Sequence, residues 1–226
     1  MTTQPQHTPD GAVQAQHVHE IAGGGKGRGS GPPPIPLSKE NVVALMAACA
    51  GNSALRDATM IRFLYDTGCR VSEACGVRIE DLELDRDRVR FHRSKTDDKL
   101  NLKIWPATVA ALERYLDFRR QLEGRMFLGA REKVFRSILS PFNSVDRRIV
   151  NKFLLKAGLA AGIPRRRCFP HALRHGRAVA MLEDGAPLLS IQRRLGHSSI
   201  TTTMKYLDVA ENWVDEWAYR AGQLPE

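Results

Sequence analysis

The amino-acid sequence predicts a mainly α-helical fold with a small antiparallel β-sheet, which is an α+β class. Helical patterns of apolar residues occupy most of the chain, and one short region, about residues 89–104, alternates between apolar and polar residues as strands do. No repeated alternation of strand and helix supports a parallel sheet. The chain has 226 residues, of which 42% are hydrophobic, so it is long enough to bury an ordinary core.

The first 37 residues differ in composition from the rest. They contain seven glycines and six prolines but few large apolar side chains, so they cannot form much of a core. We therefore expect residues 1–37 to be a disordered tail and residues 38–226 to be the folded domain. The charges of the tail balance, so the formal net charge of +9 belongs to the folded domain.

Three helices are expected before the strands. Ser38 is a candidate N-cap for a helix that runs to about Cys49, and apolar residues predict a second helix over about Leu55–Asp66. Gly68 can adopt the left-handed conformation that ends a helix. A short helix follows over Val71–Val77.

The period then changes from helix to strand. Val89 and Phe91 alternate with polar residues, and the same alternation returns at Leu100, Leu102 and Ile104. The polar residues 94–99 between them predict a turn. Helical patterns then occupy the rest of the chain, over about Ala107–Leu122, Ser144–Ala161, His171–Glu183, Leu188–Leu195, Ile200–Val209 and Glu211–Leu224.

Composition excludes several classes of protein. No apolar run approaches the roughly 18 residues that span a membrane, and the N-terminus shows no apolar signal region. The four cysteines form no CxxC pair, which argues against a zinc ribbon or a disulfide scaffold and favours a reducing compartment. A sequence pI near 9.7 suggests a polyanionic partner. We expect a cytoplasmic protein associated with the nucleoid.

The positive charge is concentrated in residues 160–206, which contain eight basic residues and two acidic ones. Arginine dominates, and its planar guanidinium suits phosphate oxygens. From charge alone, a solvated basic surface is the favoured explanation of this pattern.

Five short features carry the functional signal. They are Thr67–Glu73 (TGCRVSE), Ser94–Thr96 (SKT), His171–His175 (HALRH), Leu195–Ser199 (LGHSS), and Tyr206, nine residues after His197. In this order they resemble the catalytic domain of the tyrosine recombinases, the phage-integrase and Xer-like family. The resemblance covers about Leu37–Val209.

The residue types suit chemistry at a phosphodiester. Arg70 and Arg174 can each present a fork of donors to phosphate oxygens, and His171 shares a helix face with Arg174. A tyrosine with a pKa near 10 needs cationic groups or a base to act as a nucleophile at neutral pH. Lys95, at the tip of the predicted hairpin, can reach a leaving oxygen.

The resemblance implies a role for each of these residues. Arg70, Arg174 and His197 would stabilise the scissile phosphate, His171 would act as a general base or orient the nucleophile, and Lys95 would be the general acid. Tyr206 would attack and form a 3′-phosphotyrosyl link that a 5′-hydroxyl resolves, so neither ATP nor a metal or other cofactor is implied. The expected partner is double-stranded DNA, with phosphate contacts from Arg165, Arg166, Arg167, Arg177, Arg193 and Arg194.

Simpler explanations exist for single residues. Arg70 could contact the last carbonyls of the preceding helix, Lys99 is a rival for the acid role, and Tyr206 could be a half-buried core tyrosine. Glu73 would pair with Arg70 or orient it from behind. His175 would be structural or support the site, since no third ligand accompanies His171 and His175 as a metal pair.

Two features concern assembly. Family members usually carry a helical core-binding domain where this chain has its 37-residue tail, so it resembles short forms such as fimbrial-switch invertases, and an accessory DNA-binding protein would compensate. A truncated gene product is the alternative. An apolar stripe in the last predicted helix (Val209, Trp213, Trp217 and Leu224) would dock on a neighbouring subunit of a tetramer or on the protein's own core.

Three functions remain open at this point. The first is a site-specific DNA recombinase of a mobile genetic element that integrates, excises or inverts DNA. The second is a non-catalytic or partner-dependent DNA-binding regulator with the recombinase fold. The third is an enzyme like a type IB topoisomerase, which relaxes DNA without choice of sequence.

Overall fold

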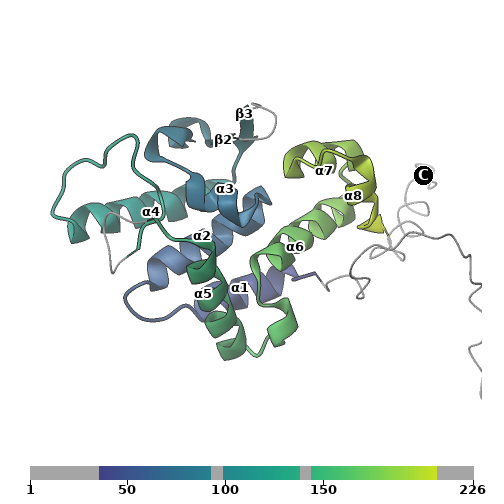
Figure 1. Ribbon diagram of the computed structural model, residues 1–226, viewed down its shortest axis with the longest axis horizontal. Coiled ribbons are helices and arrows are strands. Elements are labelled where there is room, and N and C mark those ends of the chain that lie inside the picture. The colour runs from purple at the N-terminus through teal and green to yellow at the C-terminus, as the bar shows by residue number, and fades with distance from the viewer. Residues whose placement is uncertain (1–35, 93–98, 138–143, 208–226) are drawn as a thin grey trace, which may run out of the picture. The chain divides into compact units, whose positions relative to one another are not determined.

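The helix α2 (Ala54–Thr67) lies at the centre of the fold. The computed structural model describes residues 36–92, 99–137 and 144–207 (Figure 1), and all of these residues belong to one unit. The helix α2 contacts α1, α4, α5 and α6. Its side chains Met60, Ile61, Phe63 and Leu64 are almost fully buried, because a helix with neighbours on several sides hides more than one face.

The helices before the sheet begin and end where the sequence predicts. In α1 (Lys39–Ala47), the Ser38 hydroxyl accepts a hydrogen bond from the backbone N–H of Asn41 at 3.3 Å. Gly68 ends α2 with a left-handed φ of 64°. The chain then turns into the short helix α3 (Val71–Gly76).

The sheet has three antiparallel strands in the order β1-β2-β3. The two predicted strands are confirmed as β2 and β3, in which Val89 pairs with Leu102 and Phe91 with Leu100. The strand β1 was not predicted, because two residues cannot show alternation. The bounds are β1 (Leu82–Glu83), β2 (Arg88–His92) and β3 (Lys99–Lys103), with 3₁₀ turns η1 (Ile79–Asp81) and η2 (Leu84–Arg86) on either side of β1.

The helices after the sheet follow the predicted order. Proline occupies the first turn of α4 and α6, where its missing N–H has no helical partner to lose. The predicted helix over 144–161 begins only at Arg147, because the Asp146 side chain caps it by accepting the N–H of Ile149. The elements are α4 (Pro106–Leu122), α5 (Arg147–Ala160), η3 (Arg165–Arg167), α6 (Pro170–Glu183), α7 (Leu188–Leu195) and α8 (Ile200–Met204).

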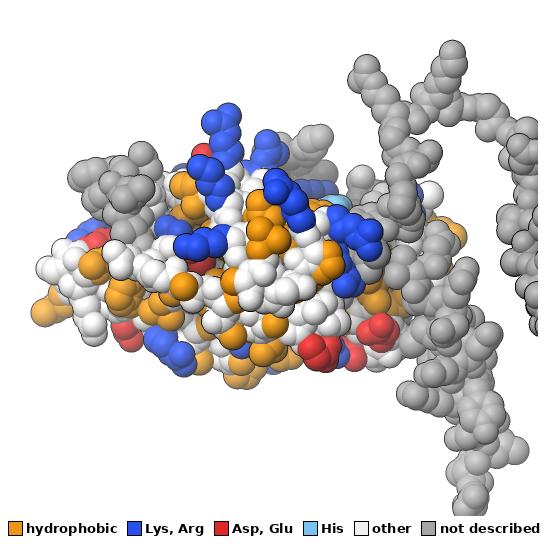
Figure 2. All heavy atoms as spheres, turned by 90° about the horizontal axis from the view of Figure 1, so that it is seen from below, with side chains coloured by type: hydrophobic (Ala, Val, Ile, Leu, Met, Phe, Trp, Pro, Cys, Tyr) orange, Lys and Arg blue, Asp and Glu red, His pale blue; other side chains and the backbone are white. Residues whose placement is uncertain are grey.

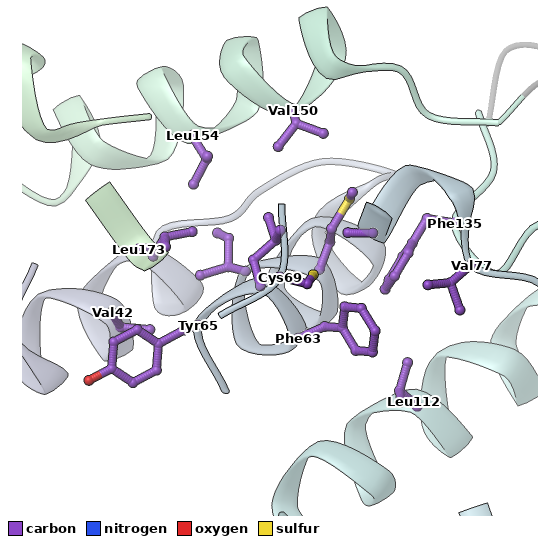
Figure 3. Packing of buried hydrophobic residues seen from close by; sticks show 14 of the residues in the cluster. Val42, Phe63, Tyr65, Cys69, Val77, Leu112, Phe135, Val150, Leu154 and Leu173 are labelled. Atoms are coloured by element: carbon purple, nitrogen blue, oxygen red, sulfur yellow. The ribbon is translucent and has the colours of Figure 1, made fainter. Parts of the chain in front are cut away.

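Buried apolar side chains form two clusters. The main cluster contains buried side chains from the five helices α1, α2, α3, α4 and α5, from the sheet and from the start of α6. It includes Phe63 and Phe135, whose ring centroids lie 5.6 Å apart (Figure 3). The second cluster is smaller and joins the last part of α6 to α7 and Tyr206. Its buried members are Ala178, Val179, Met181, Leu182, Ile191, Leu195 and Tyr206.

The folded region begins before Ser38. Leu37 is 1% exposed and belongs to the main cluster, although the sequence assigns it to the tail. Its backbone passes so close to α6 that a Cβ on Gly176 would lie 2.1 Å from the Leu37 carbonyl oxygen. Arg167 also donates a hydrogen bond to the carbonyl of Pro36 at 2.6 Å. A single apolar residue after a proline-rich stretch gives no pattern that could have revealed this packing.

Some predicted features lie outside the described residues. These are the tail up to residue 35, the turn that contains Lys95, and the helix expected over about Glu211–Leu224. Within the described ranges, every helix is too short or too polar to cross a membrane.

Candidate active site

Arg70 lies at the start of α3, directly after the turn that ends α2. The Glu73 carboxylate accepts the Arg70 backbone N–H at 2.7 Å and its guanidinium at 3.1 Å, so Glu73 both caps the helix and orients the side chain. The guanidinium also donates to the carbonyl of Gly196 at 3.4 Å. The Arg70 side chain is 49% exposed, which leaves donors available for a ligand.

Arg174 is the best-buried of the charged candidates, at 2% exposure. One Nη atom donates to the carbonyl of Gly68 at 2.6 Å, and the other donates to the carbonyl of Leu195 at 2.9 Å. The guanidinium therefore ties the end of α2 to the end of α7. Its Nε–H is shielded from solvent and has no hydrogen-bond partner within the described residues.

A row of aromatic rings connects α6 with the Tyr206 region. The rings of His171 and His175 meet edge to face, with centroids 4.4 Å apart. The His175 ring lies 5.2 Å from that of Tyr206, and the His197 ring lies 6.1 Å from Tyr206 on a nearly parallel plane. The structure thus brings together residues from three helical segments that are separated by loops in the sequence.

His197 follows Gly196, which ends α7 in the left-handed conformation with a φ of 69°. Its ring nitrogen Nδ1 lies 2.9 Å from the Thr203 hydroxyl. The Gln192 side-chain amide donates to the His197 carbonyl at 3.1 Å, and the Gln192 carbonyl accepts the His197 N–H, also at 3.1 Å. Both the backbone and the ring of His197 are therefore held in place.

Desolvation and the neighbouring charged groups lower the pKa of all three histidines. Burial lowers the pKa of His197 to about 4, with a smaller contribution from Arg174. Burial and the adjacent His171 lower the pKa of His175 to about 4. Desolvation, Arg174 and Arg70 also lower the pKa of His171. At neutral pH the positive charge of the cluster therefore comes from Arg70 and Arg174.

Tyr206 is 3% exposed and packs within the second cluster. Burial raises the pKa of its phenol, and Arg174 partly opposes that effect. This position agrees with the simpler expectation of a core tyrosine.

An open cleft of about 1450 Å³ lies beside the cluster. Arg70 and His197 line it together with His92 at the end of β2 and with Gln192 and Arg193 on α7. Tyr206 and Arg174 do not line the cleft. The end of β2 and the start of β3 reach the same cleft through His92 and Leu100. Lys95, in the predicted turn between these strands, lies outside the described residues.

Of the six arginines expected to contact phosphate, three are exposed and three contact other parts of the fold. Arg165, Arg166 and Arg193 are exposed. Figure 2 shows Lys and Arg side chains gathered in the upper half of one face, with fewer Asp and Glu side chains among them. Arg167 donates to the backbone of Pro36.

Arg177 and Arg194 do not lie free on the surface, because both contact the Trp105 ring. Arg177 is 7% exposed and stacks over the Trp105 ring at 4.3 Å. Arg194 lies over the same ring at 5.1 Å and donates to the carbonyls of Asp66 and Lys103. Burial, with a contribution from Arg177, lowers the pKa of Arg194 to about 10. Both arginines attach the last helices to the main body of the fold.

Sequence reasoning missed Gln192, Thr203 and Trp105. Gln192 and Thr203 hold His197, while Trp105 holds the two arginines. No spacing signal marks them, because each acts through a contact that exists only after folding. Within the described residues, no three His, Cys, Asp or Glu side chains are placed to hold a metal ion.

Comparisons with known proteins show the family of the chain. A family model described as the phage integrase family matches residues 36–212. The tyrosine recombinase XerD of Bifidobacterium longum is 32% identical over 183 residues, which cover 78% of this chain and 59% of that protein. XerA of Pyrococcus furiosus is 31% identical over 191 residues, which cover 84% and 63%. The chain therefore spans about three fifths of the length of both relatives.

Solved structures show the same fold. The crystal structure of XerA recombinase matches 86% of this chain and 68% of its own, with a TM-score of 0.71 and 27% identity. The XerH site-specific recombinase, bound to its palindromic difH substrate after cleavage, covers 82% of this chain and 52% of its own, with a TM-score of 0.68. At 20% identity, the second match supports the fold alone. The chain belongs to the phage integrase family, and its described region has the fold of the tyrosine recombinase catalytic domain.

Proposed function

We propose that this protein is a site-specific DNA recombinase that cuts and rejoins DNA strands through a 3′-phosphotyrosyl intermediate on Tyr206. The observation that carries the proposal is the convergence of Arg70, His171, Arg174, His197 and Tyr206. Ring contacts run from His171 through His175 to Tyr206 and His197, and the two arginines bind the neighbouring carbonyls of Leu195 and Gly196. Arg70 and His197 also line the cleft. These residue types at one place suit an attack on a phosphodiester.

The proposed reaction conserves the phosphodiester bond energy. The Tyr206 oxygen attacks the scissile phosphorus, its proton passes to His171 or to water, and the bond to the 5′-oxygen breaks. Lys95 protonates the departing 5′-oxygen. The 5′-hydroxyl of another strand then attacks the phosphotyrosyl link, which restores a DNA strand and releases Tyr206.

The arginines serve the transition state in this proposal. Negative charge builds on the non-bridging oxygens during attack, and fixed donors stabilise that charge without reorganising. Arg70 has exposed donors and a fixed carboxylate behind it. Arg174 supplies positive charge from a buried position, and burial strengthens its electrostatic effect on the phosphate.

The burial of Tyr206 implies a movement before cleavage. The tyrosine follows the five-residue helix α8 and belongs to the smaller cluster, so its release disturbs few apolar contacts. We propose that DNA binding in the cleft displaces this segment and brings the hydroxyl to the phosphate beside Arg70 and His197.

Covalent trapping tests the proposal. The full chain is mixed with fragments of the replicon that carries its gene, the reaction is stopped with detergent, and protein-linked DNA is sequenced. We expect adducts at a discrete inverted repeat that disappear in Tyr206→Phe, while DNA binding persists. Tyr65→Phe is the matched control, because Tyr65 is likewise a buried tyrosine and its hydroxyl has no hydrogen-bond partner within the described residues.

Burial of Tyr206 also favours one competing function, a DNA-binding regulator that keeps the fold without catalysis. DNA binding without adducts, in the purified protein and in cell extract alike, would contradict the recombinase proposal and support this regulator. Relaxation of unrelated supercoiled plasmids would instead indicate a topoisomerase-like activity.

The proposed partners are double-stranded DNA, further copies of the chain in a synaptic tetramer, and an accessory DNA-binding protein. The mass of the trapped complex on its DNA site tests the tetramer. If the Trp213→Ala, Trp217→Ala double variant keeps the same assembly, docking of the last predicted helix on a neighbouring subunit is excluded.

A further inference from the structure

The contact between Thr203 and His197 has a consequence for the chemistry of the site. Thr203 is fully buried, and its hydroxyl oxygen lies 2.9 Å from Nδ1 of His197. The backbone of His197 is held from the other side by Gln192 through two hydrogen bonds. With ring and backbone both fixed, the other ring nitrogen, Nε2, has one defined direction.

The position of the His197 ring proton follows from the hydrogen bonding of the buried Thr203 hydroxyl. A hydroxyl carries one hydrogen, and leaving it without an acceptor inside a protein costs about 1–3 kcal/mol. Within the described residues, Nδ1 of His197 is the hydrogen-bond partner of the Thr203 hydroxyl. If Nδ1 carried the ring proton, the Thr203 hydrogen would have no acceptor. Thr203 therefore donates to Nδ1, and the ring proton lies on Nε2.

The position of the ring proton matters because His197 is neutral. A neutral imidazole has one N–H, so its position decides whether the free nitrogen is a hydrogen-bond donor or an acceptor. The pKa of His197 is lowered to about 4, so the ring is neutral at pH 7. A phosphate oxygen accepts hydrogen bonds and is repelled by the lone pair of an unprotonated nitrogen.

We propose that Thr203 is a positioning residue that holds neutral His197 with its proton on Nε2, so that His197 donates a hydrogen bond to a non-bridging oxygen of the scissile phosphate. This inference rests on the proposed recombinase function. The backbone carbonyl of Thr203 also accepts the backbone N–H of Tyr206 at 3.0 Å. Thr203 therefore contacts both His197, the proposed phosphate donor, and Tyr206, the proposed nucleophile.

Nitrogen NMR on the full chain, labelled with ¹⁵N-histidine, tests the tautomer without any DNA. The His197 resonances are assigned from a His197→Gln spectrum. At pH 7 we expect Nε2 at the chemical shift of a protonated ring nitrogen and Nδ1 at that of an unprotonated one. In Thr203→Val, which removes the hydroxyl and keeps the shape, the preference should weaken or reverse. A protonated Nδ1 in the unaltered protein would overturn the proposal.

Cleavage rates test the consequence. Loss of one oxyanion-type donor costs about 10²–10³-fold in rate, and a disturbed tautomer removes it for part of the molecules, so Thr203→Val should slow covalent cleavage about 10–100-fold. Thr203→Ser restores the hydroxyl and should restore most of the rate together with the Nε2–H signal. Thr202→Val, at the exposed neighbouring threonine, is the matched control and should cleave normally. Equal loss in Thr203→Val and Thr203→Ser would contradict a hydroxyl-specific role.

The two measurements separate the failures of the two proposals. If the unaltered protein forms no adduct, the recombinase function fails and the phosphate contact fails with it, whatever the tautomer is. If adducts form but Nδ1 carries the proton, the role of Thr203 fails and the recombinase function stands. Thermal unfolding of Thr203→Val shows whether it folds, and the spectrum of the unaltered protein does not depend on that variant.

Discussion

The main cluster and the second cluster support different parts of the candidate active site. The main cluster holds the end of α2 and therefore Arg70, and it contains most of the buried aromatic rings. The second cluster contains Tyr206 itself and Leu195, two residues before His197. The helix α6 belongs to both, since Leu173 packs in the main cluster and Val179 in the second. The site therefore spans a junction between a large core and a small one.

This difference indicates how Tyr206 can move, as the proposed reaction requires, without unfolding of the protein. A region with few buried apolar contacts opens at a lower free energy than the core does. Among the described residues the second cluster has few such contacts, so we expect the part of the site that holds Tyr206 to open while Arg70 stays in place. Polar contacts across the junction, above all those of Arg174, then decide how the two halves are aligned.

The largest expected effect comes from Arg174→Lys, which removes hydrogen bonds that connect the ends of α2 and α7. One lysine nitrogen cannot reach the carbonyls of both Gly68 and Leu195 in place of two guanidinium nitrogens. Since a hydrogen bond to a charged group contributes about 1.5–3 kcal/mol, we expect a loss of about 2–4 kcal/mol in the free energy of unfolding, together with loss of covalent cleavage. Urea unfolding measures the first. Arg165→Lys, at an exposed position, is the control, and a loss below about 1 kcal/mol in Arg174→Lys would show that the junction does not depend on this fork.

The second expected effect is a loss of stability in acid, centred on the histidines beside Tyr206. The pKa of His175 and of His197 is about 4 in the folded protein, against 6.5 for an unperturbed histidine. The unfolded chain therefore binds more protons between these values, so stability is complete above about pH 6.5 and is lost as the pH falls toward 4. At about 1.4 kcal/mol per pKa unit, and with both rings only partly buried, we expect a combined loss of about 2–4 kcal/mol.

Unfolding measured by urea at several pH values checks this window. In His175→Gln the dependence on pH between 6.5 and 4 should become shallower. If the variant and the unaltered protein lose stability in parallel, His175 does not contribute to the effect.

The smallest expected effect concerns the Trp105 stack, which attaches α6 and α7 to the chain after β3. A double-mutant cycle with Trp105→Leu and Arg194→Met should give a coupling energy of about 0.5–1 kcal/mol, because the ring is partly exposed. Hydrogen exchange should rise in α7 and α8 of the single variants more than in α2. Equal rises in both regions would mean that the two clusters open together.

The sequence predicted most of the fold and the identity of the clustered residues. Gly68 ends its helix in the left-handed conformation as expected, and Val89 and Phe91 form the predicted buried face of a strand. These features depend on local patterns that a sequence displays directly. The burial of Tyr206 was expected only as an alternative, because a single tyrosine carries no sign of its depth.

The remaining site contacts depend on long-range packing. Arg177 and Arg194 belong to a basic stretch, and the sequence offered only phosphate contact or a solvated surface for them. Their stacking on Trp105 joins residues more than 70 positions apart, which no local pattern encodes. The position of Lys95 stays a prediction, since it lies outside the described residues.

The close passage of Leu37 over Gly176 has a practical consequence for shortening the protein. A version that begins at Ser38 would keep the N-cap of α1 but would remove a fully buried leucine and the carbonyl that Arg167 binds. Gly176 would then face an empty slot, because it has no side chain to fill the space that the Leu37 backbone occupies. A leucine lost from a core costs about 2–5 kcal/mol. Crystallisation and NMR work on a trimmed protein should therefore keep Pro36 and Leu37.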